Sequence, residues 1–262
     1  MSAAAVFRAL LHKGALALVL VAAAPAFAQA PQAYEPQSGQ AGKDVIWVPT
    51  PQALVDKMLD MAKVTPRDFV MDLGSGDGRT VITAAKRGAR AMGVEYNPDM
   101  VELSKRNAEK EGVADKATFA KADLFETDFS QATVITMFLL PTINLKLRPK
   151  ILNLKPGTRI VSNSFNMDTW NPDETAVLGA AIDSTSVCTA YYWVVPAKVA
   201  GTHKVAQGEL VLKQTFQMLS GTLTTEGRAV PVEGKVVGEE ILLAGGGRNY
   251  RGRLTGKTLE LR

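Results

Sequence analysis

From Asp68 onwards, the apolar residues form short continuous runs that alternate with stretches of helical spacing. Runs of four to eight apolar residues, bounded by turn formers, are typical of buried strands. They predict strands at residues 68–73, 89–96, 116–124, 132–140 and 158–165. The stretches between them predict helices at residues 79–88, 98–112 and 142–154, the last weakened by Pro149. Strands that alternate with helices predict an α/β fold with a parallel sheet covered on both faces.

One more helix is expected before this alternation. Thr50 can cap the free amides of a helix that begins at Pro51, because threonine is a good N-cap and proline is tolerated at the first helical position. Leu54, Met58 and Met61 recur at helical spacing, which predicts a stripe packed in the core.

The pattern changes again towards the C-terminus. Residues 175–182 and 186–196 are two β-like runs split by a short polar stretch, which predicts a hairpin. Residues 201–262 show no helical spacing, and their short runs are separated by glycine-containing turns. We expect a small C-terminal antiparallel β domain there, a barrel or half-barrel with Phe216 and Tyr250 in its core.

The N-terminus has the pattern of a secretory signal peptide at residues 1–28. Arg8 and Lys13 precede an apolar run and the A-x-A site that ends at Ala28. The run is about 11 residues long, whereas a membrane-spanning helix needs roughly 20. We therefore expect a cleaved, exported and periplasmic protein with no integral membrane segment, the alternative being an uncleaved anchor. Residues 29–44 are rich in Gln, Pro and Gly and predict a flexible lead-in.

Composition excludes several classes of protein. The formal charge is +4, and loss of the leader removes two basic residues and no acid, which leaves +2. So small a charge argues against a nucleic-acid partner. Beyond residue 28 there is one histidine, His203, and one cysteine, Cys188, so a disulfide, a zinc cluster and a Cys–His nucleophile are not expected. Cys188 lies in an apolar run and is predicted to be a core residue.

Candidate chemistry is concentrated in "DLGSGDGR", residues 72–79. A strand that ends in a glycine-rich turn and enters a helix brings backbone N–H groups close to a ligand. Gly74 and Gly76 permit the sharp turn and the close approach. The dinucleotide pattern G-x-G-x-x-G is not met, because Arg79 stands where it needs its third glycine. Asp72, two residues before the first glycine, suits a ligand that carries ammonium and sulfonium charges better than a pyrophosphate.

Together, "VMDLGSGDGR", "GVEYN" and "KADLFE" resemble the class I S-adenosylmethionine-dependent methyltransferases. The resemblance covers roughly residues 45–196 and implies a methyltransferase domain at residues 45–198, with a seven-stranded Rossmann-like sheet whose last strand is antiparallel. It implies S-adenosylmethionine as cofactor and roles for matching positions. Gly74 and Gly76 would line the methionine part, with Asp72 nearby. Glu95 would accept from both ribose hydroxyls, Asp123 from the adenine amino group, and Leu124 would lie beside the ring.

These acids have structural alternatives. Asp72 and Asp123 also suit loop-bracing or capping acids, and Glu95 suits a surface acid at a strand end. Asp77 and Arg79 are expected to be structural residues of the loop.

The methyl acceptor is expected at the end of the fourth strand, in "TMFLLP". Phe138 and Pro141 would line an apolar channel there, or simply close a buried strand end. Amide-nitrogen and adenine methyltransferases carry Asn/Asp-Pro-Pro-aromatic at this place, and this chain does not.

"WVPTP" and "FLLP" are similar to a subgroup that includes protein-lysine methyltransferases. That similarity implies that Trp47 and Thr50 close the site. A lysine acceptor must lose a proton, to water or to a carboxylate such as Asp168, whose alternative is a plain loop acid. The acceptor is thus a protein lysine or a small envelope molecule, and no catalytic residue is assigned.

Two other functions compete with methyl transfer. The first is an exported small-molecule-binding protein that keeps the methyltransferase fold without turnover, since a fold alone does not establish activity. The second is a nucleotide-linked oxidoreductase, which the spacing of the glycine loop disfavours.

Overall fold

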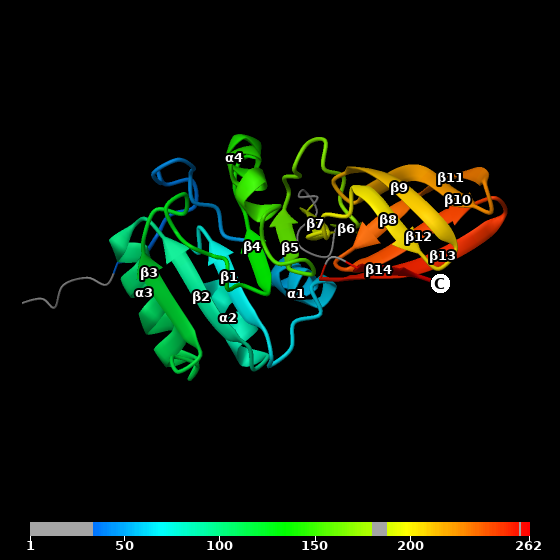
Figure 1. The fold of residues 1–262 in the computed structure, drawn as a ribbon. Helices are drawn as coiled ribbons and strands as arrows, with labels where there is room; N and C mark the ends of the chain where they lie inside the picture. The colour runs from blue at the N-terminus through cyan, green and yellow to red at the C-terminus, as the bar shows by residue number, and fades with distance from the viewer. Residues whose placement is uncertain (1–33, 180–187, 257) are drawn as a thin grey trace, which may run out of the picture. The chain divides into compact units, whose positions relative to one another are not determined.

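The computed structural model describes residues 34–179, 188–256 and 258–262, which form two seven-stranded sheets (Figure 1). The predicted signal peptide, residues 29–33 of the lead-in and the tip of the predicted hairpin lie outside these residues. The first sheet has the strand order β3-β2-β1-β4-β5-β7-β6. Its strands are β1 (Phe69–Leu73), β2 (Arg90–Glu95), β3 (Ala117–Lys121), β4 (Val134–Met137), β5 (Arg159–Asn163), β6 (Glu174–Leu178) and β7 (Cys188–Val194).

Strands β1 to β5 pair in parallel, and β7 pairs antiparallel with both β5 and β6. This confirms the predicted Rossmann-like sheet and its antiparallel last strand. Successive side chains of β1 and β4 enter opposite cores, as the two-residue period of a strand requires. Val70 and Val134 join one core, whereas Met71 and Ile135 join the other.

The helices cover both faces of this sheet, as its two buried faces require. They are α1 (Gln52–Met61), α2 (Arg79–Lys86), α3 (Pro98–Lys110) and α4 (Pro141–Ile151). Helices α1, α2 and α3 contribute to the first core and α4 to the second. The Asn97 side chain caps α3 by accepting a hydrogen bond from Asp99 N at 2.9 Å. Helix α4 continues through Pro149 for only two more residues.

Two expectations about helix starts are wrong. Thr50 does not cap α1, whose N-cap is Pro51 without a side-chain hydrogen bond. The Thr50 hydroxyl instead accepts a hydrogen bond from Asn163 Nδ2 at 3.2 Å, so it is engaged with the end of β5. Helix α4 begins at Pro141 rather than at residue 142, because proline suits the first helical position.

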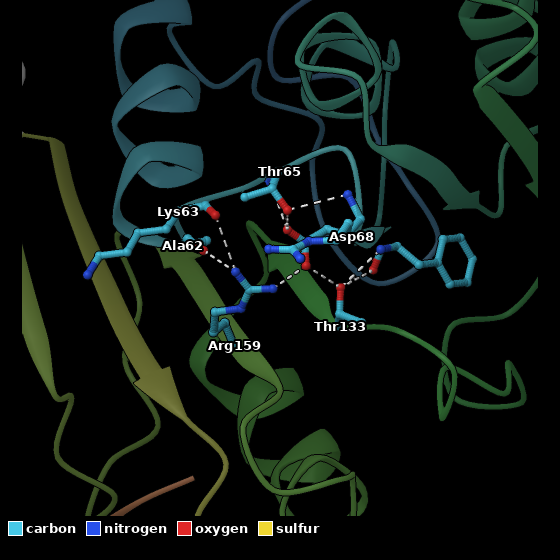
Figure 2. Close-up of polar contacts among 8 residues, drawn as sticks. Ala62, Lys63, Thr65, Asp68, Thr133 and Arg159 are labelled. Carbon is cyan, nitrogen blue, oxygen red and sulfur yellow. Dashed lines mark hydrogen bonds and ion pairs between the residues drawn. The ribbon is translucent and has the colours of Figure 1, made fainter.

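A polar network fixes the start of β1, at the opposite end from the glycine loop (Figure 2). Arg159 of β5 forms an ion pair with Asp68 and donates to Ala62 O at 2.6 Å. Asp68 also accepts from the Thr65 amide at 2.8 Å and from Thr133 Oγ1 at 2.8 Å. Burial alone raises the pKa of the Asp68 carboxyl, but these hydrogen bonds and the Arg159 charge outweigh it and hold the pKa below its usual value. The network therefore joins the ends of three adjacent strands.

The second sheet is an antiparallel meander in sequence order, β8 to β14, which confirms the predicted C-terminal β domain. Its strands are β8 (Gly201–Val205), β9 (Gly208–Thr215), β10 (Met218–Thr225), β11 (Arg228–Val237), β12 (Glu240–Gly245), β13 (Arg248–Thr255) and β14 (Thr258–Leu261). The first and last strands lie against each other without pairing, which corresponds to a nearly closed barrel. Tyr250 packs on the meander core as expected, whereas Phe216 packs on the second core of the other sheet.

Two further sequence predictions concern the burial of Cys188 and the absence of a membrane-spanning helix. Cys188 is half-buried and packs against the first core. Within the described parts of the chain, no helix combines the length and apolarity needed to cross a membrane.

Candidate active site

The glycine loop between β1 and α2 is built as its sequence requires. Gly74, Gly76 and Gly78 have φ values of +81°, +54° and +84°, in the left-handed region that favours glycine. The Gly74 amide donates to Val94 O at 2.9 Å, and the Gly76 amide donates to Glu95 Oε2 at 3.0 Å. The loop is therefore fastened to the carboxyl end of β2.

The two glycines predicted to line the ligand have little free space beside them. A Cβ atom on Gly76 would lie 2.5 Å from Trp47 Nε1, which is a clash. A Cβ atom on Gly74 would lie 3.1 Å from Leu139 Cδ2. Bare backbone at these positions lets side chains from two other segments close around the loop.

Asp72 is buried at the end of β1, with 6% of its surface exposed. It accepts a hydrogen bond from Thr136 Oγ1 of β4 at 2.7 Å. Burial raises the pKa of Asp72 to about 7, and the nearby charges of Glu95 and Asp77 add to the rise against the lowering effect of the Thr136 bond. A ligand with positive charge would favour the ionised form of this group.

Glu95 is held at the end of β2 by backbone donors. Its Oε2 accepts from the Gly76 amide at 3.0 Å, and its Oε1 accepts from the Asn97 amide at 2.9 Å. Each carboxylate oxygen has two acceptor sites, so one on each remains for two neighbouring hydroxyl donors. This arrangement matches a ribose diol.

Asp123 follows β3 and is engaged by two donors. Its Oδ1 accepts from the Phe125 amide at 2.9 Å, and its Oδ2 pairs with the Lys43 ammonium. The Lys43 hydrogen bond, with the Phe125 bond, lowers the pKa of the Asp123 carboxyl. Lys43 also lies over the Tyr96 ring, 4.9 Å from its centroid. No local pattern indicates this pair, because Lys43 and Asp123 are 80 residues apart.

Residues 39–47, here the N-terminal turn, fold against these strand ends. The Gly39 amide donates to Trp47 O at 2.8 Å, and the Trp47 amide donates to Gln40 O at 2.9 Å. Behind the turn, Arg79 NH1 donates to Thr50 O at 2.8 Å and its guanidinium pairs with Asp77. Arg79 and Asp77 thus brace the loop, as expected, and residues 39–44 of the predicted lead-in are folded into the N-terminal turn.

A cavity of about 700 Å³ lies between the N-terminal turn and the carboxyl ends of β1 to β4. It brings together most of the predicted site residues, which are Trp47, Thr50, Asp72, Gly74, Gly76, Glu95, Asp123, Leu124 and Phe138. Pro141 and Asp168 do not line it. The lining residues that the sequence did not point to include Lys43, Tyr96, Ile143 and Phe165. Phe165 is the last residue of the strand predicted at residues 158–165, and this place at a strand end was the one available signal.

The end of the cavity at β4 and β5, where the acceptor is expected, is aromatic and apolar. The rings of Phe138 and Phe165 stack with centroids 6.1 Å apart at an angle of 25°. Leu140 beside them is 42% exposed. The two ends of the cavity therefore differ. Acidic side chains and the glycine loop lie at the ends of β1 to β3, and aromatic side chains lie at the ends of β4 and β5.

The walls fit an adenosyl sulfonium. The volume lies within the roughly 300–1,000 Å³ typical of small-molecule sites. Carboxylates at adjacent strand ends match the hydroxyl and amino donors of adenosine, and a buried acid beside bare glycine matches a cationic methionine part. Within residues 34–179, 188–256 and 258–262, no group of three acidic, His or Cys side chains is placed to hold a metal ion.

Comparisons with known proteins agree with this geometry. The family model of the ANTKMT methyltransferase domain matches residues 72–174. A protein-lysine N-methyltransferase of Saccharolobus islandicus is 45% identical over 163 residues, which are 61% of this chain and 96% of that protein. The adenine nucleotide translocase lysine N-methyltransferase of Mus musculus is 35% identical, and the alignment covers 49% of this chain and 56% of the mouse protein.

Among solved structures, an RNA methyltransferase from Salinibacter ruber in complex with S-adenosyl-L-homocysteine is 47% identical with a TM-score of 0.54. The match covers 58% of this chain and 96% of that chain. The chain belongs to the class I S-adenosylmethionine-dependent methyltransferases. Its cofactor is S-adenosylmethionine, and the C-terminal meander lies beyond the part that the family model matches.

Proposed function

We propose that the protein transfers a methyl group from S-adenosylmethionine to the ε-amino group of a protein lysine. Two features of the cavity carry this choice of acceptor, which are its paired basic side chains and its aromatic end at β4 and β5. Five acids line the cavity, Asp44, Asp72, Asp77, Glu95 and Asp123, against two basic residues, Lys43 and Arg79. Both basic residues are paired with acids of this set. The cavity therefore offers no unpaired basic side chain among its described lining residues to the phosphates of RNA, and its aromatic end at β4 and β5 suits a lysine side chain. The protein-lysine relatives support the same choice.

Cofactor binding is assigned to the strand ends. Each Glu95 oxygen accepts from one backbone amide, and the remaining acceptor site on each accepts from a ribose hydroxyl. Asp123 accepts from the adenine amino group, beside Leu124. Gly74 and Gly76 allow the methionine part to approach the loop, with Asp72 as its buried counter-charge, and Thr50 and Trp47 close the cavity from the N-terminal side. The cofactor supplies an electrophilic methyl group on sulfur.

The protein's contribution to the transfer is positioning and loss of water. The acceptor side chain enters alongside the stacked rings of Phe138 and Phe165 and packs against them. Apolar walls disfavour the charged form and lower the pKa of the entering amine, which promotes loss of its proton. Among the described residues that line the cavity there is no histidine, and Asp168 lies outside it, so the proton passes to water.

The experiment uses methyl-tritiated S-adenosylmethionine with the envelope fraction and, separately, the total RNA of the source cells. The envelope is chosen because residues 1–28 predict export. We expect label that protease removes and ribonuclease does not, recovered as methylated lysine after acid hydrolysis. Label confined to RNA would contradict the proposal, and cofactor binding without label in either sample would favour a binding protein.

A substitution at the aromatic end of the cavity tests whether the acceptor lysine enters beside Phe138 and Phe165, a path called here the lysine channel. Phe165→Ala should lower transfer to the envelope fraction roughly fivefold to tenfold by removing one ring face, which contributes about 1 kcal/mol. Cofactor affinity, measured by calorimetry, should stay within about twofold, because Phe165 lies at the acceptor end. The control is Tyr250→Ala in the meander, which should change neither quantity. An equal loss of methyl transfer in Phe165→Ala and Tyr250→Ala would show that Phe165 does not contact the acceptor.

Asp72 should make cofactor affinity depend on pH. Its pKa of about 7 is that of the ligand-free protein, and the sulfonium favours the ionised form, so binding releases a proton below pH 7. Affinity for S-adenosylmethionine relative to S-adenosylhomocysteine should therefore rise up to about tenfold from pH 6 to pH 8. Any pH dependence that comes from the amino-acid part cancels in this ratio, because both ligands carry that part. Calorimetry at pH 6, 7 and 8 measures it, and Asp72→Asn should flatten the profile. The same steep profile in the variant would exclude Asp72 as the titrating group.

A further inference from the structure

The segment between β5 and β6, residues 164–173, joins the acceptor end of the cavity to the C-terminal meander. Phe165 at its start stacks on Phe138 in the cavity wall. Trp170 near its end is fully buried and stacks on Phe216, with ring centroids 6.0 Å apart at an angle of 16°. The β5–β6 loop, as we call residues 164–173, is thus in contact with the cavity and with the turn between β9 and β10.

We propose that this turn, Phe216 and Gln217, is a positioning element for the acceptor side of the active site. It acts by holding the β5–β6 loop in the conformation that sets Phe165 opposite Phe138. The acceptor part of this inference rests on the proposed lysine channel, whereas the positioning of the loop does not.

The hydrogen bonds at the junction are specific. Gln217 is 5% exposed, and its Nε2 donates to Asn171 O of the loop at 2.7 Å. Asp173, the last residue of the loop, accepts from the Val194 amide at 2.9 Å. An amide side chain buried at this position would lose a partner if the loop moved, and an unpaired buried polar group costs about 1–3 kcal/mol.

Arg148 of α4 connects the same elements from the other side. Its NH1 donates to Met167 O of the loop at 2.8 Å, and its guanidinium lies 5.4 Å from the centroid of the Phe216 ring. Asn144, one turn earlier on α4, donates to Phe165 O at 3.2 Å. The loop is therefore clamped between α4 and the β9–β10 turn.

The backbone of the loop needs such external support. Ser164 and Asp168 have φ values of +61° and +55°, and Phe216 of the turn has +54°. Non-glycine residues in this region cost of order 1–3 kcal/mol each and persist only where surrounding contacts hold them. The loop conformation that places Phe165 is thus maintained by contacts outside the loop.

Hydrogen exchange of the full chain, followed by mass spectrometry, tests the proposal without knowledge of the acceptor. Phe216→Leu and Gln217→Ala should accelerate exchange of residues 164–173 at least about fivefold, and leave residues 72–80 and the affinity for S-adenosylhomocysteine unchanged. The matched control is Gln207→Ala, because Gln207 Nε2 also donates to a backbone carbonyl, Leu261 O, at 3.0 Å, but within the meander. It should not affect residues 164–173.

Transfer to the envelope fraction supplies the second measurement. The turn variants should raise the acceptor KM more than threefold and leave the KM for cofactor unchanged. Unchanged exchange of residues 164–173 in both turn variants, or equal acceleration across the whole chain, would overturn the proposal. Faster exchange of the loop without any lysine methylation would contradict the proposed function and leave the positioning role intact.

Discussion

Replacement of Glu95 by alanine is expected to weaken the affinity for S-adenosylmethionine and S-adenosylhomocysteine at least about 100-fold. Two charge-assisted hydrogen bonds to ribose hydroxyls are lost, each contributing about 1.5–3 kcal/mol, and every 1.4 kcal/mol is tenfold. The change also leaves the Gly76 and Asn97 amides without their acceptors. Because Glu95 sits at the adenosyl end, both ligands should lose affinity by the same factor in calorimetry.

Two variants control this experiment. Glu95→Gln keeps an acceptor oxygen and should lose less affinity than Glu95→Ala. Glu102→Ala removes an acid from the exposed surface of α3, where it pairs with Lys105, and should bind both ligands normally. Normal affinity in Glu95→Ala would exclude a ribose role for this residue.

Gly76→Ala is expected to weaken the affinity for the cofactor between about 10- and 100-fold. The added methyl group meets Trp47 Nε1 at 2.5 Å and Trp47 Cδ1 at 3.0 Å, so the indole has to leave its place over the loop. Trp47 is the end of the hydrogen-bonded N-terminal turn, and its displacement opens that side of the cavity.

The matched control for the backbone is Gly112→Ala. Gly112 has a similar φ, +67° against +54°, but a Cβ atom there meets nothing within 4 Å. Both variants should lose about 1 kcal/mol of unfolding free energy through the left-handed conformation, and Gly76→Ala should lose more because its methyl group displaces Trp47. Only Gly76→Ala should lose cofactor affinity, and equal affinities in the two variants would show that the contact between Gly76 and Trp47 is irrelevant to binding.

The sheet and the cofactor end of the site could be predicted because both depend on local patterns. Alternating apolar runs and helical spacing determine a doubly covered parallel sheet, and carboxyl ends of neighbouring strands meet at one edge. Asp72, Glu95 and Asp123 stand at or just after such ends, and the resemblance to class I methyltransferases implied that they share one site.

The remainder of the site depends on contacts between distant segments, which carry no local signal. The pairing of Lys43 with Asp123 joins residues 80 apart, and that of Phe216 with Trp170 joins the two sheets. Phe216 is an aromatic residue within the meander sequence, which predicts a place in the meander core. In the structure, the β9–β10 turn places it against the second core of the first sheet. Thr50 has the right type for a helix cap, and only the tertiary fold places Asn163 beside its hydroxyl.

A crystal structure of the chain with S-adenosylhomocysteine tests the central claim most directly. We expect the adenosyl group in the cavity at the ends of β1 to β3, with its ribose hydroxyls on Glu95 and its adenine amino group on Asp123. Lys43 should then share or give up the Asp123 carboxylate, with which it forms an ion pair. Nucleoside density elsewhere, or in this cavity with Glu95 and Asp123 uncontacted, would contradict it.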